Sequence, residues 1–106
     1  MKLKDYWSYL SNEVGCVVCR MRPASIHHCM GGSIADAGIT KAASKKNSDW
    51  LVLPLCYDHH QGRNGLHQIG VRTWEKRFGL QVTFVVELSR GVSFNLIERT
   101  GLLLPT

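Results

Sequence analysis

Long apolar runs are missing from this sequence of 106 residues. None of its apolar stretches approaches the roughly 20 residues that a helix needs to cross a bilayer. The N-terminal stretch MKLKDYWSYL starts with basic character but lacks the apolar segment and the small-residue cleavage site of a secretory signal. We therefore expect a cytoplasmic protein without a membrane partner.

Internal repeats are also absent, and acidic residues are few. The length is that of one ordinary domain, so we expect a single domain over residues 1–106. A domain this small often gains stability from a bound metal. Eight acidic residues against 13 Lys and Arg give a net charge of +5 and a pI of about 9.3. This balance suits a polyanion such as nucleic acid, although a basic protein with no such partner fits the charge equally well.

Cysteines number only four. In the cytoplasm cysteines are kept reduced, which makes metal ligands or free thiols more common than disulfides. The spacing Cys16-x-x-Cys19 forms one compact pair, and Cys56-x-x-His59 forms a second. Together they are typical of a closed, tetrahedral structural zinc site. The alternative is a set of free buried thiols.

The expected elements mix helices with short strands, which predicts an α+β fold. Helix-like spacing favours a helix over residues 4–13 that stops at Gly15. The segment 24–29 reads as a short strand. Within the apolar segment 50–56, we expect a buried strand that ends at Pro54. Residues 30–49 read as a loop. A short helix follows at 57–62, where Asp58 would cap the N-terminus or stabilise it by its negative charge. Another helix is expected over 68–78, ended by Gly79. The tail from 80 to 106 fits a strand or a helix.

Two pairs of adjacent histidines, His27-His28 and His59-His60, stand out. Neighbouring side chains diverge on a strand or a helix, so one pair cannot easily bind a single ion. If His59 faces the zinc, His60 faces elsewhere, and one histidine of the first pair can meet it there. The other then remains as a general base, because neutral imidazole is a suitable base near pH 7. For any one histidine alone, an ordinary hydrogen-bonded residue is the simpler interpretation.

The order of these motifs resembles a known superfamily. GCVVCR, ASIHHC, SDWLVLPLCYDHHQGRNGLH and WEKRFG are similar to the HNH endonucleases with their ββα-metal motif. More narrowly, they resemble the Ref-type, RecA-dependent nucleases of phages and prophages. The resemblance covers about residues 7–79, and it leaves 80–106 as a C-terminal extension. It implies a small zinc-stapled ββα-metal nuclease domain with flanking helices.

The resemblance also implies roles for individual residues. His28 corresponds to the general base, and His27, His60 and His67 correspond to ligands of a catalytic divalent ion. Asp49 lies near the place of a bracing asparagine, for which Asn47 is an alternative. The implied reaction is metal-assisted hydrolysis of DNA phosphodiester bonds in recombination, in the cytoplasm of a bacterial or phage-infected cell. A RecA filament is an implied partner.

The catalytic ion and the DNA contacts are less defined. Magnesium prefers oxygen ligands whereas imidazoles suit zinc, nickel or cobalt, so Mg²⁺ or Mn²⁺ as the working ion and Zn²⁺ as another occupant both stay open. Six basic residues are candidates for phosphate contacts: Lys41, Lys45, Lys46, Arg72, Lys76 and Arg77. A solvated surface is the alternative for these charges.

Two other classes of protein compete with the nuclease. A noncatalytic zinc module that binds nucleic acid or a protein would need only the cysteine-containing site. A zinc deaminase is suggested by Pro54-Leu55-Cys56 but requires a His-x-Glu motif, which neither histidine pair provides. We therefore set the deaminase aside and keep the zinc module as the alternative.

Overall fold

The fold is centred on two antiparallel strands, β1 (Ser25–His28) and β2 (Val52–Leu55). The computed structural model describes residues 2–38 and 49–90 of the chain. The helices in these ranges are α1 (Leu3–Tyr9), η1 (a π-helix, Leu10–Val14), α2 (Gly32–Asp36), α3 (Tyr57–His60), α4 (Leu66–Ile69), α5 (Val71–Phe78) and α6 (Gln81–Arg90). The α+β class predicted from the sequence is confirmed. None of these helices combines the length and the apolar character that crossing a membrane requires.

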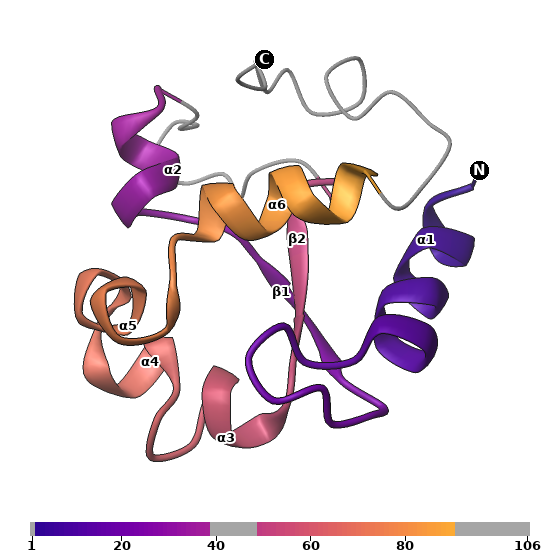
Figure 1. The fold of residues 1–106 in the computed structure, drawn as a ribbon, viewed down its shortest axis with the longest axis horizontal. Coiled ribbons are helices and arrows are strands. Elements are labelled where there is room, and N and C mark those ends of the chain that lie inside the picture. Colours follow the sequence, from indigo (N-terminus) through magenta and orange to yellow (C-terminus); the bar gives the residue numbers. More distant parts are fainter. Residues whose placement is uncertain (1, 39–48, 91–106) are drawn as a thin grey trace.

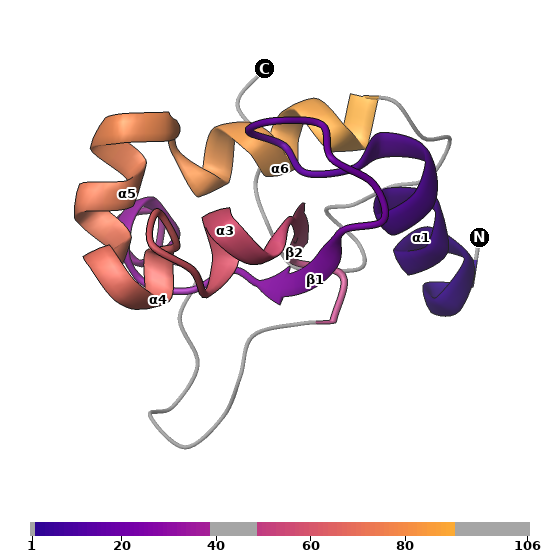
Figure 2. The ribbon, with the colours of Figure 1, turned by 90° about the horizontal axis from the view of Figure 1, so that it is seen from below.

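As Figures 1 and 2 show, α6 lies over one face of the strand pair, and α1 lies at its side. The register pairs His27 with Leu53 and His28 with Val52. Directly paired residues share a face and successive residues alternate. His27 and Leu53 therefore point toward α6, where Leu53 packs with Val85. Val52 and His28 point toward α1, where Val52 packs with Tyr6 and Leu10.

The first helix agrees with its prediction over residues 4–13, because α1 continues into η1 and the pair ends at Val14. Gly15 follows with a φ of 77°, in the left-handed region that favours glycine. The two predicted strands are also found. The second runs one residue past its predicted end, since Pro54 lies inside β2. Both strands of a two-stranded sheet are edge strands, so Pro54 can lie where no backbone donor is needed.

Three predictions need correction or completion. The helix expected over 68–78 is two helices, because Gly70, with a φ of 91°, separates α4 from α5. The segment expected to be a loop contains α2, whose Ile34 is fully buried in the core. The ambiguous tail begins with α6, and residues 91–106 lie outside the described residues.

Candidate metal centres

The first site is a cysteine–histidine cluster, defined by the side chains of Cys16, Cys19, Cys56 and His59. The first two ligands lie on a tight turn after η1. In this turn the Arg20 N–H donates to the Cys16 carbonyl at 2.8 Å and the Cys16 N–H donates to the Met21 carbonyl at 3.0 Å. The other two ligands flank the first turn of α3. The structure thus brings together the four residues predicted from their spacing.

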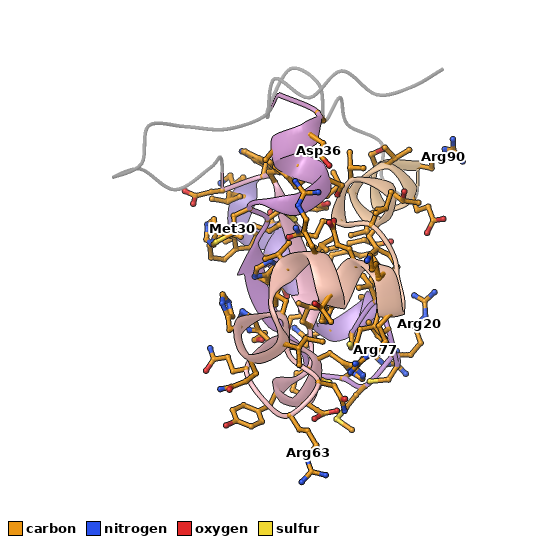
Figure 3. All side chains as sticks on the ribbon, turned by 90° about the vertical axis from the view of Figure 1, so that its left-hand side faces the viewer. Arg20, Met30, Asp36, Arg63, Arg77 and Arg90 are labelled. Carbon is orange, nitrogen blue, oxygen red and sulfur yellow. The ribbon has the colours of Figure 1, made fainter. Side chains whose placement is uncertain are left out.

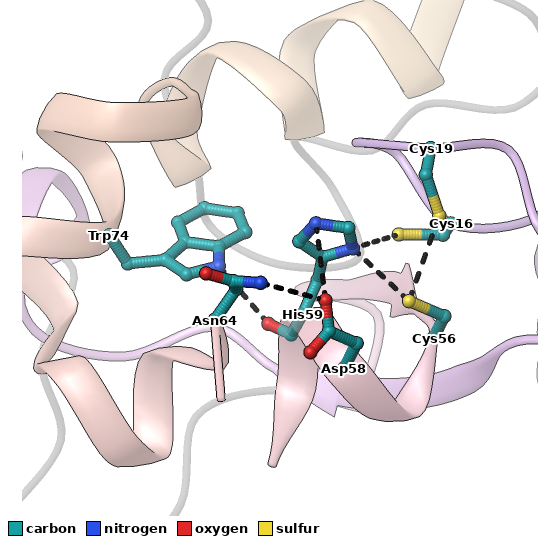
Figure 4. Close-up of polar contacts among 7 residues, drawn as sticks. All are labelled: Cys16, Cys19, Cys56, Asp58, His59, Asn64 and Trp74. Atoms are coloured by element: carbon teal, nitrogen blue, oxygen red, sulfur yellow. Dashed lines mark hydrogen bonds and ion pairs between the residues drawn. The ribbon is translucent and has the colours of Figure 1, made fainter. Parts of the chain in front are cut away.

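The geometry of this cluster matches a tetrahedral ion (Figure 4). The ligand atoms all lie within 4.8 Å of one another. The Cys16 Sγ–His59 Nδ1 and Cys19 Sγ–Cys56 Sγ distances are both 3.7 Å, and the Cys56 Sγ–His59 Nδ1 distance is 3.1 Å. A zinc ion with Zn–S bonds of about 2.3 Å and Zn–N bonds of about 2.0 Å separates its ligand atoms by about 3.5–3.8 Å. The cluster can therefore hold a structural metal such as zinc.

The thiols of the cluster favour a cation at this place. Burial raises the pKa of Cys16, but hydrogen bonds, led by those from the backbone N–H groups of Cys56 and Cys19, outweigh it and leave the pKa below its ordinary value. At Cys56 burial prevails and raises the pKa to about 11. Three sulfur atoms this close repel one another once deprotonated, and a bound cation relieves that repulsion. The cluster contains no disulfide, since its cysteines are free thiols.

His59 is held in place from the side away from the sulfur atoms. Its backbone carbonyl accepts a hydrogen bond from Trp74 Nε1 at 3.1 Å, and the ring of Phe78 packs against its imidazole with centroids 5.0 Å apart. Trp74 is fully buried and belongs to the core. These contacts fasten α5 to the cluster.

The second site is a three-histidine cluster, defined by His27, His60 and His67, with one ligand nitrogen from each within 4.8 Å of the others. The ring centroids lie 5.1 Å apart for His27 and His60, 5.5 Å for His27 and His67, and 4.9 Å for His60 and His67. His59 and His60, although adjacent, thus face different clusters. The structure brings together the three histidines that the resemblance implies as ion ligands.

Gly65 explains how His67 reaches this cluster. A side-chain Cβ at position 65 would lie 2.5 Å from the backbone carbonyl carbon and oxygen of His60. Contacts this short do not occur in real structures, so only glycine lets α4 return this closely to α3. The return places His67, in α4, beside His60.

Burial keeps two members of the cluster in the form that binds metals. Burial lowers the pKa of His27 to about 4 in spite of a hydrogen bond to Gln81. The pKa of His60 is lowered first by burial and then by the charge of the nearby His67. Both imidazoles are therefore neutral near pH 7. Neutral imidazole is the ligand form of histidine.

His28 lies on the other face of β1 and has a different partner. Its Nε2 is 2.8 Å from Asp49 Oδ1, and its ring meets the edge of Trp7 with centroids 5.7 Å apart. The Trp7 indole N–H donates to the Asp49 carbonyl at 2.9 Å, which holds the residue that carries the carboxylate. A carboxylate accepts only, so it favours the neutral tautomer with hydrogen on Nε2 and a free lone pair on Nδ1. Asn47, the alternative to Asp49, lies outside the described residues.

The basic residues proposed for phosphate contact divide into two groups. Lys41, Lys45 and Lys46 lie outside the described residues. In α5, Arg72 forms a two-pronged ion pair with Asp36, with both N–O distances 2.9 Å, whereas Lys76 and Arg77 are exposed in the last turn. Figure 3 views the molecule from the side of α5 and labels Arg77 there.

Several residues that shape the site were not singled out in the sequence. The Ser25 hydroxyl lies 2.9 Å from His60 Nδ1, and the Gln81 side-chain oxygen lies 3.0 Å from His27 Nε2. Glu75 is buried and accepts from the backbone N–H of Ser33 at 2.9 Å and of Gln81 at 2.8 Å. Ser25 and Glu75 lie inside the segments ASIHHC and WEKRFG, but nothing in these segments assigns them a role, and Gln81 lies in no quoted motif. Their roles follow from the contact of β1 with α3 at Ser25 and from the packing of α2, α5 and α6 at Glu75 and Gln81.

The fold and the two clusters define a small α+β chain with side chains arranged to bind metal. A family model described as "Protein of unknown function (DUF968)" matches residues 1–95. The chain belongs to this family. No curated protein and no solved structure matches the chain.

Proposed function

We propose that the chain is a metal-dependent HNH endonuclease that hydrolyses phosphodiester bonds of DNA. The observation that carries the proposal is the division of the histidines among three tasks. His59 joins the cysteine–histidine cluster, His60 joins the three-histidine cluster, and His28 pairs with Asp49. The strand pair followed by α3 supports it as well, because the resemblance to HNH nucleases implies a ββα unit; in this chain α2 is inserted between β1 and β2.

The three-histidine cluster is the candidate for the catalytic ion. Three imidazoles would leave a coordination position of a bound ion open, which is the pattern of catalytic rather than structural sites. His27, His60 and His67 would hold a divalent ion, which would supply positive charge that stabilises the charge developing on the leaving 3′ oxygen. Imidazole ligands suit Zn²⁺, Ni²⁺ or Co²⁺, whereas Mg²⁺ prefers oxygen, so Mg²⁺ or Mn²⁺ as the working ion and Zn²⁺ as another occupant are compared directly in the tests.

His28 is the candidate general base. It directly follows the ligand His27 in β1, so the Cα atoms of the two residues lie about 3.8 Å apart. With Nε2–H bonded to Asp49, the free Nδ1 accepts a proton from water. The water oxygen attacks phosphorus in line, the P–O3′ bond breaks, and the departing 3′ oxygen takes a proton from solvent water. The products carry a 5′-phosphate and a 3′-hydroxyl group.

Positive charge on the surface supports DNA as the substrate. Lys76 and Arg77 are exposed and suited to phosphates, whereas the guanidinium of Arg72 is already engaged by Asp36. Contacts of this kind position a duplex without reading its sequence. A RecA filament on single-stranded DNA remains a proposed partner, in keeping with a role in phage or prophage recombination.

The proposal predicts metal-dependent nicking of DNA. Purified protein with one zinc bound is incubated with supercoiled plasmid in Mg²⁺ or Mn²⁺, and in parallel with single-stranded DNA coated by RecA and ATP. We expect cleavage in at least one arm, none in EDTA, and nicks that DNA ligase seals directly, because sealing requires a 5′-phosphate and a 3′-hydroxyl.

One outcome would contradict the proposed cleavage step, and another would contradict the nuclease activity itself. Nicks that ligase does not seal would overturn the proposed direction of bond breakage. If the chain binds DNA but cleaves it in none of the arms, and holds a single metal ion, the result would favour the noncatalytic zinc module.

A further inference from the structure

The two buried histidines of the three-histidine cluster use different ring nitrogens for their protein partners. His27 contacts Gln81 through Nε2, and His60 contacts Ser25 through Nδ1. A neutral imidazole carries one hydrogen, so the nitrogen that donates it to a partner leaves the other nitrogen with the lone pair that binds a metal. The direction of each hydrogen bond therefore decides which nitrogen faces the ion.

At His60 the direction follows from Ser25. The Ser25 hydroxyl has one hydrogen, and its Oγ lies 2.7 Å from the Leu55 carbonyl, which can only accept. The hydroxyl donates there and must accept from His60 Nδ1, 2.9 Å away. The lone pair of His60 is consequently on Nε2.

At His27 the direction follows from Gln81, which is fully buried. The Gln81 Nε2 group donates to the Met30 carbonyl at 2.8 Å, and the Met30 N–H donates to Gln81 Oε1 at 3.3 Å. This double contact fixes the amide orientation, so the atom facing His27 Nε2 at 3.0 Å is the oxygen. An amide oxygen accepts only. His27 Nε2 therefore carries the hydrogen, and its lone pair is on Nδ1.

We propose that Gln81 is a positioning residue of the metal centre, whose side-chain oxygen holds His27 in the tautomer that presents Nδ1 to a divalent ion. The inference rests on the proposed role of the three-histidine cluster. It adds α6, outside the segment that resembles HNH nucleases, to the metal centre. Because the amide of Gln81 is neutral, it does not offset the positive charge that the ion presents to a phosphate. A carboxylate partner would instead make His27 a more basic ligand.

The frame around Gln81 supports this role. Its backbone N–H donates to Glu75 Oε2 at 2.8 Å, and Glu75 Oε1 accepts from the Ser33 N–H at 2.9 Å. A Cβ at Gly32 would lie 2.1 Å from Glu75 Oε1, so glycine lets α2 approach the carboxylate. α2, α5 and α6 thus jointly fix the place from which Gln81 reaches His27.

The tautomers can be read directly by NMR of the ring nitrogens in the zinc-bound chain without a second ion. We expect His27 with hydrogen on Nε2 and His60 with hydrogen on Nδ1. Hydrogen on Nδ1 of His27 would overturn the proposal.

The effect on metal binding is tested by titrating Co²⁺ calorimetrically into chains that already carry one zinc. We expect Gln81→Met to weaken binding at the three-histidine cluster by about 10–100-fold, the usual cost of losing an outer partner of a ligand. Gln81→Glu keeps an acceptor for His27 and should restore most of the affinity. Ser33→Ala is the matched control, because it loosens the start of α6 through Glu75 and Val82 but leaves the acceptor intact.

The outcomes separate this proposal from the nuclease. Wild-type affinity in Gln81→Met, equal weakening in Ser33→Ala, or a wild-type chain that binds no second ion would overturn the role of Gln81. Because neither readout uses DNA, a chain that passes both tests yet cleaves no DNA contradicts only the nuclease.

Discussion

Replacement of Cys56 by serine is expected to remove most of the bound zinc and to abolish cooperative thermal unfolding. The cysteine–histidine cluster joins Cys56 to Cys19, 37 residues earlier in the chain. Structural zinc contributes about 10–16 kcal/mol in zinc-finger peptides at pH 7. Small domains have a net stability of only about 5–15 kcal/mol, so this chain should not remain folded without the ion. Zinc per chain and the melting curve by circular dichroism measure the effect.

Cys29→Ala is the matched control for this prediction. Cys29 is fully buried but packs with Ile34, Leu51, Leu53 and Val85, away from the cluster. The Cys29→Ala substitution should lower the free energy of unfolding by about 1–2 kcal/mol, as expected for a modest shortening of a core side chain. The variant should keep its zinc. A Cys56→Ser chain that retains zinc and melts with the wild type would show that the cluster is not a structural metal site.

Replacement of His28 by alanine should lower the rate of metal-dependent DNA cleavage by about 10²–10⁴-fold, the usual contribution of a general base. The metal content should stay at the wild-type level, because His28 faces Asp49 and Trp7 rather than the three-histidine cluster. Cleavage rates on plasmid under single-turnover conditions, with metal counted in the same samples, measure both effects.

Met30→Ala is the control here. The Met30 side chain is 44% exposed, and the contacts of Met30 with Gln81 use only its backbone. Met30→Ala should cleave like the wild type, and added imidazole should partly restore His28→Ala, because the His28 side chain is 21% exposed. Equal rates for His28→Ala and the wild type would remove the proposed base.

The local elements were predictable because their signals lie within a few residues. The apolar spacing before Gly15 predicts α1 and η1, the segment ASIHHC predicts β1, and the apolar stretch WLVLPLC predicts β2. The division at Gly70 and the helix α2 were not predicted. Both depend on distant contacts, such as the burial of Ile34 against β2 residues and the approach of Gly32 to Glu75.

The candidate site was predictable where covalent geometry alone decides it. Adjacent side chains diverge, so His59 and His60 had to face different places, and the same holds for His27 and His28. Ser25 and Gln81, the partners that decide which ring nitrogen of each histidine carries the hydrogen, could not be predicted from the sequence. Their contacts span 35 and 54 positions of the chain and carry no periodic signal.

A crystal structure of the His28→Ala chain with Mn²⁺ and a short DNA duplex tests the central claim most directly, because anomalous scattering distinguishes manganese from zinc. We expect zinc on Cys16, Cys19, Cys56 and His59. We expect manganese on Nδ1 of His27, Nε2 of His60 and a nitrogen of His67, in contact with a phosphate oxygen. Zinc alone, or manganese bound away from the three histidines, would contradict the account.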